Sequence, residues 1–519
     1  MALAWLVASV LTIGAMHGAH AQARPDAGAL QQQIERDRMQ SLPPGGGLER
    51  PVAPPPALAA PAGGATVTVT SFRFAGNRLI DGDELAQVVS EYLNRPLTFA
   101  DLQQAAAAVA NAYREAGWIV RAYLPRQDIS GGVVTIQIVE AVFGGMRIEG
   151  EKPSRESFYH VEDMIDYQQK LGEPLNADTL DRALLLASDL PAVTVAGSLE
   201  EGGKPGETAL ALKFTDKPLM TGDGVIDNTG SRSTGRNRFA GNLYLNSPFS
   251  RGELFTANYI HSQSSDRLTS DGSDYIRLAA SVPLGLDGAR VGLNSSYMHY
   301  TLITPEYDAL DANGTSATVG LEASYPLIRS RLLNLFLNAN IDHKAFNNYS
   351  LDTVTSRYMS DSLTLTLSGN LFDKLGGGGA NNFSLAFTSG LLNLDGSANK
   401  AADAATTRTA GNYNKIRFSL SRQQAITEEL SAYLAYSGQA AAKNLDSSEK
   451  FYIGGASGIR AYPTNEGGGA DAHMVNFELR QRLPEGFTLI GFFDYGRVLA
   501  NHDNHFSGSA VPNGYDLKG

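Results

Sequence analysis

The residues most able to form a specific interaction lie in two segments near the C-terminus. The first, GGASGIRAYP at Gly454–Pro463, is rich in glycine and holds one arginine, Arg460, and one aromatic residue, Tyr462. In the second, GFFDYG at Gly491–Gly496, the carboxylate of Asp494 interrupts an apolar run. A charge removed from water costs on the order of several kcal/mol unless a partner compensates it. Arg460 and Asp494 are therefore predicted to form an ion pair.

The position of Asp494 in its segment predicts which way its side chain points. Successive side chains of a strand face opposite sides, and Asp494 shares its side with Thr488 and Gly496. We expect this side to face water and the other side to face an apolar medium. The other side carries Phe487, Leu489, Phe493 and Tyr495.

Two further charged residues accompany the predicted pair. Glu478 and Arg480 occupy the polar side of another alternating segment, and could compete for Arg460 or extend the pairing. The alternatives are that Arg460 is a solvated loop arginine and that Asp494 has no partner. An exposed pair would contribute less than about 1 kcal/mol, whereas a partly desolvated bidentate pair could hold a loop in place.

The composition limits the class of protein. A chain of 519 residues is expected to form two to four units. It has no cysteine, which excludes a disulfide framework, a thiolate metal site and a cysteine nucleophile. Its net charge of -12 argues against a nucleic-acid-binding surface. The 54 glycines, 21 tyrosines and 21 phenylalanines favour short strands and tight turns over helix bundles.

The N-terminal region predicts export. An apolar run at Ala2–Ala15 precedes a small-x-small site at Ala19–Ala21, so residues 1–21 are predicted to be a signal peptide. Residues 22–41 contain a polar segment, Ala29–Gln40, which we expect to form a short helix without a continuous apolar stripe. Residues 42–65 are rich in proline and glycine and are predicted to be a semi-rigid linker.

Two compact α/β units are predicted next, at 66–141 and 142–216. In the first, Thr98 and Asp101 form a candidate capping box before a helix that Gly117 ends. In the second, Asn176 is the candidate N-cap of a corresponding helix. Strands flank these helices in both units, so the plan β-α-α-β-β occurs twice.

Helical periodicity stops after Lys217, and strict two-residue alternation takes over. In Leu333–Asp342 and Leu363–Ser368, for example, apolar residues alternate with Asn, Thr and Ser. We count about thirteen such segments, joined alternately by short turns and long polar loops. This pattern is typical of a transmembrane antiparallel β-barrel over residues 217–519. A soluble β-sandwich or propeller would also alternate, but its strands need not span a bilayer.

No residue set supports catalysis, a cofactor or a metal ion. The chain lacks the GxSxG, P-loop and HExxH motifs, so we expect no enzyme activity. His502 and His505 lie three apart in a loop rich in Asn and Gly, a pattern more typical of solvated loop residues than of a metal site.

The chain resembles the outer-membrane transporters of two-partner secretion, the haemolysin-activator type within the Omp85 superfamily. The segments at Gly117–Ile136 (GW-x5-LPRQDISGGVVTI) and Gly172–Pro191 (GEPLNADTLDRALLLASDLP) resemble the two POTRA domains of that family. The segment Gly458–Tyr462 (GIRAY) resembles its VRG-(F/Y) loop motif, with Ala461 in place of glycine. The segment with Phe492, Asp494 and Gly496 resembles the strand that carries the partner of the arginine.

The resemblance implies an architecture and a location. The Gly458, Ile459, Arg460, Ala461 and Tyr462 loop would fold into the barrel, and the polar helix would plug it at rest. The family has sixteen barrel strands, so we expect further strands beyond Gly519. The POTRA domains would lie in the periplasm of a Gram-negative bacterium and the barrel in its outer membrane.

The function implied is export of one unfolded partner exoprotein, of the adhesin or haemolysin type, bound through the POTRA domains. Besides the exoprotein, only outer-membrane lipid is expected as a partner, with the barrel monomeric or weakly dimeric. Two alternatives stay open: an insertase that assembles other outer-membrane proteins, and a passive porin.

Overall fold

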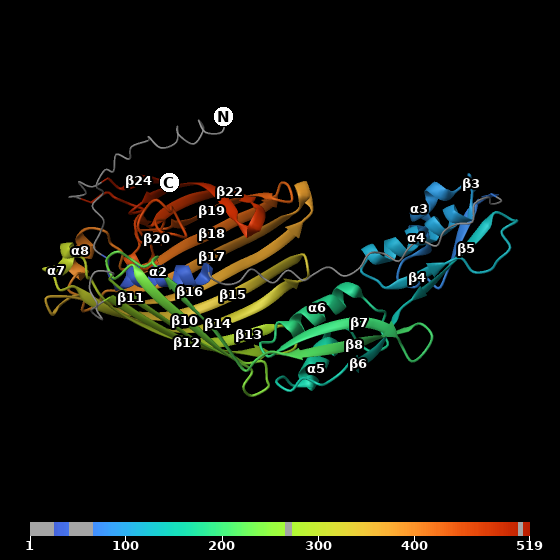
Figure 1. Ribbon diagram of the computed structural model, residues 1–519, viewed down its shortest axis with the longest axis horizontal. Coiled ribbons are helices and arrows are strands. Elements are labelled where there is room, and N and C mark those ends of the chain that lie inside the picture. The colour runs from blue at the N-terminus through green and yellow to red at the C-terminus, as the bar shows by residue number, and fades with distance from the viewer. Residues whose placement is uncertain (1–24, 41–65, 265–271, 507–511) are drawn as a thin grey trace, which may run out of the picture.

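The computed structural model describes residues 25–40, 66–264, 272–506 and 512–519. Two small α/β units extend from one end of a large curved sheet, and a helix, α2, lies inside the curve of that sheet (Figure 1). The predicted signal peptide and linker lie outside the described residues.

The large sheet has fourteen strands in the order β24-β23-β22-β19-β18-β17-β16-β15-β14-β13-β12-β11-β10-β9, every neighbouring pair antiparallel. The expected number was about thirteen, and the short segment Gly514–Lys518, which pairs with β23 as strand β24, brings the total to fourteen. The strands are β9 (Met220–Asp227), β10 (Asn237–Asn246), β11 (Leu254–Gln263), β12 (Gly272–Leu284), β13 (Ala289–Thr301), β14 (Asn313–Arg329), β15 (Leu333–Ser350), β16 (Thr353–Asp373), β17 (Gly379–Asn393), β18 (Gly411–Ala425), β19 (Leu430–Ala441), β22 (Asp471–Arg482), β23 (Thr488–Leu499) and β24.

Short helices and two short strands lie in the connections between the strands of the large sheet. Two of them, β20 and β21, pair with each other in the long loop between β19 and β22. The elements are α7 (Pro305–Asp308), η2 (Leu375–Gly377), α8 (Lys400–Ala405), η3 (Ser447–Glu449), β20 (Phe451–Tyr452), β21 (Gly468–Gly469) and η4 (Pro484–Gly486).

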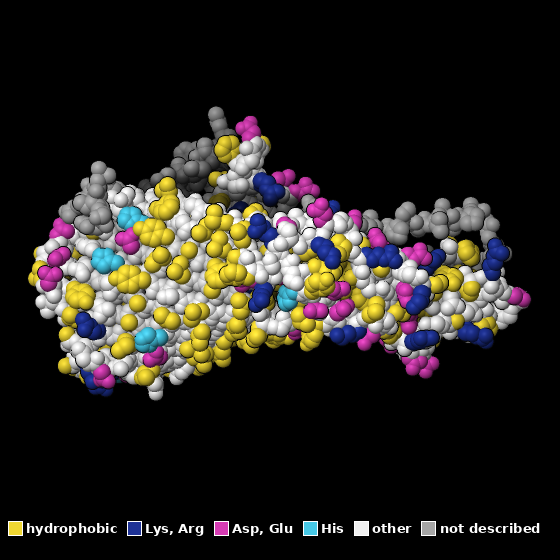
Figure 2. Space-filling model, turned by 90° about the horizontal axis from the view of Figure 1, so that it is seen from below, with side chains coloured by type: hydrophobic (Ala, Val, Ile, Leu, Met, Phe, Trp, Pro, Cys, Tyr) yellow, Lys and Arg dark blue, Asp and Glu magenta, His cyan; other side chains and the backbone are white. Residues whose placement is uncertain are grey.

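Alternation gives the sheet an apolar outer face and a polar inner face. On β16, Leu363 and Leu365 are each 43% exposed, whereas Ser362 between β15 and β17 is 7% exposed and faces inward. Figure 2 shows hydrophobic side chains over the outer face, densest in a band next to the α/β units. Among the described residues, no helix is both long and apolar enough to cross a membrane.

The first α/β unit contains a three-stranded sheet, β2-β5-β4, and helices packed on one side of it. Thr98 and Asp101 make the predicted capping box at the start of α4, and Gly117, with a φ of 82°, follows its end. The elements are β1 (Val67–Thr68), β2 (Ser71–Ala75), α3 (Gly82–Val88), η1 (Ser90–Tyr92), β3 (Pro96–Leu97), α4 (Phe99–Glu115), β4 (Val120–Tyr123) and β5 (Val133–Glu140).

The second unit repeats this plan with the sheet order β6-β8-β7. Asn176 caps α6 by accepting hydrogen bonds from the backbone of Asp178 and Thr179. Its core also contacts Leu286, in the turn between β12 and β13, so the unit packs on the near end of the barrel sheet. The elements are β6 (Val142–Ile148), α5 (Phe158–Gln168), α6 (Ala177–Ser188), β7 (Val193–Glu201) and β8 (Glu207–Asp216).

Candidate functional site

The loop between β19 and β22 folds into the barrel and brings Arg460 to Asp494. The guanidinium donates to both carboxylate oxygens, Nη2 to Oδ1 at 2.6 Å and Nε to Oδ2 at 2.8 Å. The backbone N–H of Arg460 donates to Oδ2 as well, at 3.1 Å. Asp494 is fully buried and Arg460 is 24% exposed on its side chain. This is the partly desolvated, bidentate geometry in which an ion pair can hold a loop.

Neighbouring side chains of the inner wall complete the arrangement around Arg460. Glu478 accepts from Arg460 and also from Arg480 Nε, at 2.7 Å, so both predicted secondary residues take part. The ring centroid of Phe492 lies 3.8 Å from Arg460 Cζ, a cation–π contact. Arg460 is thus held on three sides by groups of β22 and β23.

Asn476 is a member of this arrangement that the sequence reasoning missed. Its amide donates to Asp494 Oδ1 at 2.8 Å and to the carbonyl of Gly458 at 2.9 Å. It lies directly opposite Asp494 in the β22–β23 register. Asn476 and Glu478 are two residues apart on β22, so their side chains face the same way. This shared inward orientation was the feature of the sequence that could have indicated the role of Asn476.

Close packing within this loop and against β23 explains two glycines, Gly458 in the loop and Gly496 in β23. A Cβ at Gly458 would lie 2.0 Å from the carbonyl oxygen of Ile453, and one at Gly496 would lie 2.8 Å from Ile453 Cδ1. Ile459 is fully buried in a small apolar cluster, against which Tyr462 packs. Positive φ angles in this loop occur at Gly455, Asn465 and Gly467 and not at Ala461, so alanine fits its position. The cluster consists of Ile453, Ile459, Ala472, Met474, Val498 and Leu517.

A second buried anchor holds the same loop eleven residues earlier, and the sequence reasoning missed it. Glu449 lies between two lysines of the inner wall, with Oε1 2.9 Å from Lys344 Nζ and Oε2 2.5 Å from Lys415 Nζ. Burial alone would raise the pKa of Glu449, but the two ammonium groups outweigh it and hold the pKa well below its usual range. Arg417 donates to the carbonyl of Lys450 at 3.0 Å and adds a further tie.

Helix α2 (Ala27–Gln40) rests on this second anchor and on the inner wall. The Asp26 carboxylate accepts from Ser447 Oγ at 2.7 and 2.8 Å, and Gln32 Oε1 accepts from Arg417 Nη2 at 3.0 Å. Gln31 donates to Thr318 Oγ1 at 2.6 Å, and Glu35 accepts from Tyr275 Oη at 2.6 Å. The helix is therefore bound to both the loop and the wall.

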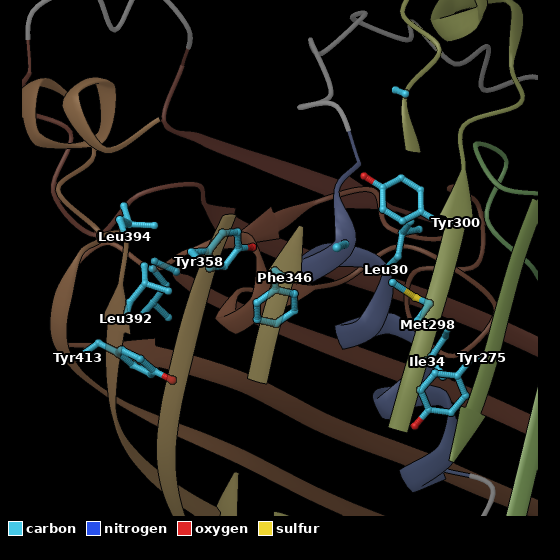
Figure 3. Close-up of a cluster of buried hydrophobic side chains, with 14 of the residues drawn as sticks. Leu30, Ile34, Tyr275, Met298, Tyr300, Phe346, Tyr358, Leu392, Leu394 and Tyr413 are labelled. Atoms are coloured by element: carbon cyan, nitrogen blue, oxygen red, sulfur yellow. The ribbon is translucent and has the colours of Figure 1, made fainter. Parts of the chain in front are cut away.

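This helix has a short apolar face in its first two turns, although its sequence is mostly polar. Ala27, Leu30 and Ile34 lie on one face, 0%, 3% and 7% exposed, because their spacing of three and four residues follows the helical turn. Figure 3 shows Leu30 and Ile34 directed at Tyr275, Met298 and Tyr300. The sequence signal was weak, because only three apolar residues are involved.

The helix does not fill the barrel interior. A cavity of about 360 Å³ remains beside it, lined by polar and charged side chains of α2, of the strands β12 to β19 and of the loop after β19, and by the apolar side chains of Phe346, Phe418, Phe451 and Met474. A second hollow of about 880 Å³ lies between α6 and the near rim of the barrel. One hollow therefore lies at the rim next to α6, and the other lies beside α2 in the barrel interior.

Charged pairs bridge the α/β unit and the barrel rim beside the second hollow. Arg329 of β14 donates two hydrogen bonds of 2.8 Å to the carboxylate of Asp189, and Arg182 of α6 lies 2.9 Å from Asp287. Burial would raise the pKa of Asp287, but hydrogen bonds from Tyr325, Arg182 and Gln168 outweigh it and lower the pKa. These contacts fix the orientation of α6 at the mouth of the barrel.

The two histidines considered in the sequence lie in the loop after β23. His502 Nδ1 contacts Asp471 Oδ2 at 2.9 Å, and His505 Nδ1 contacts Asp503 Oδ1 at 3.0 Å. In the part of the chain that the structure describes, no group of three or more His, Cys, Asp or Glu side chains could hold a metal ion.

The comparisons with known proteins agree with this architecture. A family model described as haemolysin secretion/activation protein ShlB/FhaC/HecB matches residues 206–515, more than half of the chain. The chain belongs to this haemolysin secretion/activation family. A second model, for the ShlB-type POTRA domain, matches residues 67–141, which makes the first α/β unit a POTRA domain.

Individual relatives in the haemolysin secretion/activation family extend over most of the chain. The heme/hemopexin transporter protein HuxB of Haemophilus influenzae (strain 86-028NP) is 26% identical over 506 residues, 95% of this chain and 87% of the relative. The outer membrane transporter CdiB of Dickeya dadantii (strain 3937) is 25% identical over 77% of this chain and 69% of its own.

Solved structures share the fold. CdiB from Escherichia coli matches with a TM-score of 0.70 at 22% identity, covering 96% of this chain and 91% of that one. CdiB from Acinetobacter baumannii matches with a TM-score of 0.61 at 16% identity, covering 92% and 89%. The chain is an outer-membrane β-barrel transporter of a Gram-negative bacterium, with its POTRA domains in the periplasm. The rim that carries Asp287 is accordingly the periplasmic one.

Proposed function

We propose that this protein captures one partner exoprotein with its POTRA domains and exports it unfolded through the barrel. The observation that carries the proposal is the position of α2. The helix narrows the barrel interior but is part neither of the sheet nor of the loop between β19 and β22. It is held by side-chain hydrogen bonds and by a small apolar face. A segment held in this way can leave without disrupting the sheet, which a pore for a bulky polymer requires.

The second POTRA domain supports capture of an extended chain. Its strand β7 lies at the edge of the sheet. The N–H of Val195 donates to Ser188 Oγ, and the carbonyl of Val195 accepts from the same hydroxyl, so both backbone groups of Val195 point away from β8. Because backbone groups alternate along a strand, those of Gly197 and Leu199 point the same way. An exoprotein segment adds to this edge as a further strand, so that main-chain hydrogen bonds supply the affinity.

The Arg460 loop remains inside the barrel during export as a structural element, because its release would leave the fully buried carboxylate of Asp494 without its counter-charge. Once the exoprotein emerges, its folding outside draws the remaining chain forward by mass action. No enzyme activity and no cofactor enter this cycle.

The test uses the absence of natural cysteines. An ideal Cβ at Gly28 would lie 2.8 Å from Ser448 Cβ, and a disulfide needs about 3.8 Å between Cβ atoms, so a small shift lets Gly28→Cys and Ser448→Cys bond. We expect oxidation of this pair to stop secretion of the exoprotein encoded beside the gene, and reduction to restore it. Each single-cysteine variant is the control.

Unchanged secretion by the oxidised pair would contradict the proposal. A passive porin would show altered conductance on oxidation and no secreted partner. An insertase would show instead a broad loss of other outer-membrane proteins when the gene is deleted.

A further inference from the structure

The inner wall of this barrel carries an apolar patch that its polar character does not predict. The patch consists of inward-facing side chains of β12, β13 and β15, none more than 1% exposed. Figure 3 shows these side chains gathered around the end of α2 that carries Leu30 and Ile34. They are Tyr275, Met298, Tyr300 and Phe346.

Most of the surface that α2 covers on this patch is hydrocarbon. Tyr300 Oη donates to Asn348 Oδ1 of the wall at 2.8 Å and keeps this partner when α2 leaves, whereas Tyr275 Oη donates to Glu35 of α2 itself and loses that bond. Phe346 stacks on Tyr358 with 4.8 Å between ring centroids. What remains to be covered is aromatic ring and thioether, a surface that suits aliphatic side chains of varied shape.

Helix α2 covers this surface with Ala27, Leu30 and Ile34 only. Its described polar contacts include hydrogen bonds to Thr318, Arg417, Tyr275 and Asn348 and to the carbonyls of Tyr452 and Gly454, which water could replace when the helix leaves. Water cannot replace the aliphatic contacts in the same way, because wetting an apolar surface is unfavourable. The main free-energy cost of withdrawing α2 is therefore exposure of the patch to water. Other aliphatic groups would reduce this cost if they took the place of Leu30 and Ile34.

We propose that the patch is a binding site for aliphatic side chains of the polypeptide in transit, which replace Leu30 and Ile34 of α2. The site is suited to an extended segment in which aliphatic residues alternate with small polar ones. Binding there would compensate for removal of the helix and would give the moving chain a transient hold near the end of the pore opposite the POTRA domains. This inference rests on the proposed function, since it assumes that a polypeptide enters the barrel.

The test needs no natural exoprotein. The full-length protein with Leu30→Ser and Ile34→Ser, which loosens α2, is placed in a planar bilayer. A synthetic 20-residue peptide of alternating Leu and Ser is added on the periplasmic side, and the durations of current blockades are recorded. A Ser–Gly peptide of equal length is the control. We expect blockades about tenfold longer for the leucine peptide, and loss of this difference when Met298→Ser and Phe346→Ser are added.

Equal blockade times for the two peptides, or a difference that survives the changes at Met298 and Phe346, would overturn the inference. If the doubly changed patch prevents folding, as judged by loss of the gel-mobility shift on heating, the single change Met298→Gln replaces it. Met298→Leu keeps the apolar surface and should keep the long blockades. Failure of the proposed function would appear separately, as normal peptide blockade without any secreted partner.

Discussion

The carboxylate of Asp26, just before helix α2, accepts a hydrogen bond of 2.7 Å from the hydroxyl of Ser447 in the loop between β19 and β22. The same loop carries Arg460, which is bound to Asp494 on the barrel wall. Helix α2 therefore rests on a loop that is itself anchored twice, at Glu449 and at Arg460. Weakening either anchor should loosen the helix.

Replacing Asp494 by asparagine should destabilise the folded barrel and release the loop. Arg460 would lose its buried counter-charge, and we expect a cost of about 2–4 kcal/mol, reduced from that of a fully buried pair by the partial exposure of Arg460. Thermal unfolding in detergent measures the loss, and secretion should fall with it. Asn476→Ala, which removes a neutral donor to the same carboxylate, should cost about 1 kcal/mol. Equal effects of the two changes would contradict this account.

Acidification should tighten the plug. Burial and the nearby charge of Asp446 raise the pKa of Asp26 from 3.8 to about 6, against hydrogen bonds from Ala29 and Ser447 and the charge of Lys450. The docked state therefore takes up a proton more readily than the released state. The resulting stabilisation is complete below pH 3.8 and is lost as the pH rises through 6.

Single-channel conductance should accordingly be lower near pH 4 than near pH 7. Asp26→Asn should remove this dependence and keep the plug docked at neutral pH. A pH profile unaltered by that substitution would assign the titration to another group.

Neutralising Glu449 should open the pore without unfolding the barrel. In Glu449→Gln, Lys344 and Lys415 face each other across a neutral amide, and the loop segment that supports α2 loses its anchor. We expect higher conductance and faster proteolysis of the N-terminal region. Glu485→Gln, in an exposed turn, is the matched control and should change neither readout.

The edge of β7 offers a test of main-chain recognition. Leu199→Pro removes an N–H that points away from β8, so the sheet should stay intact while capture of an extended exoprotein segment weakens. Leu199→Thr changes the side chain but keeps the N–H, and should bind normally. The measurement is the affinity of each purified variant for an N-terminal fragment of the exoprotein, which should fall for Leu199→Pro and stay unchanged for Leu199→Thr. Equal loss in both variants would show that the side chain, and not the backbone, is recognised.

Local patterns in the sequence were sufficient to predict the barrel and the inward orientation of the Asp494 side chain, because the side of a strand that a residue faces depends only on its position among its neighbours. They were insufficient for the Glu449 anchor. Lys344, Lys415 and Glu449 belong to three distant segments, which meet only when the sheet curves around the loop. The same holds for α2, whose short apolar stripe has meaning only beside Tyr275, Met298 and Tyr300.

Strand β24 is difficult to recognise in the sequence for a different reason. Gly514–Lys518 is only five residues long, too short for alternation to stand out, and its pairing with β23 depends on the adjacent strand. The POTRA domains, in contrast, were predictable to their helix caps, because capping at Thr98 and Asn176 is a local interaction.

The cavity beside α2 also bears on which solutes an unplugged pore would favour. Its lining outside α2 includes five basic side chains and two acidic ones, namely Arg277, Lys344, Lys415, Arg417 and Lys450 with Asp342 and Glu449. The field at this constriction is therefore positive, opposite in sign to the net charge of -12 of the whole chain. Small anions would pass in preference to cations, and acidic stretches of a polypeptide would be drawn inward where lysine-rich stretches would meet resistance.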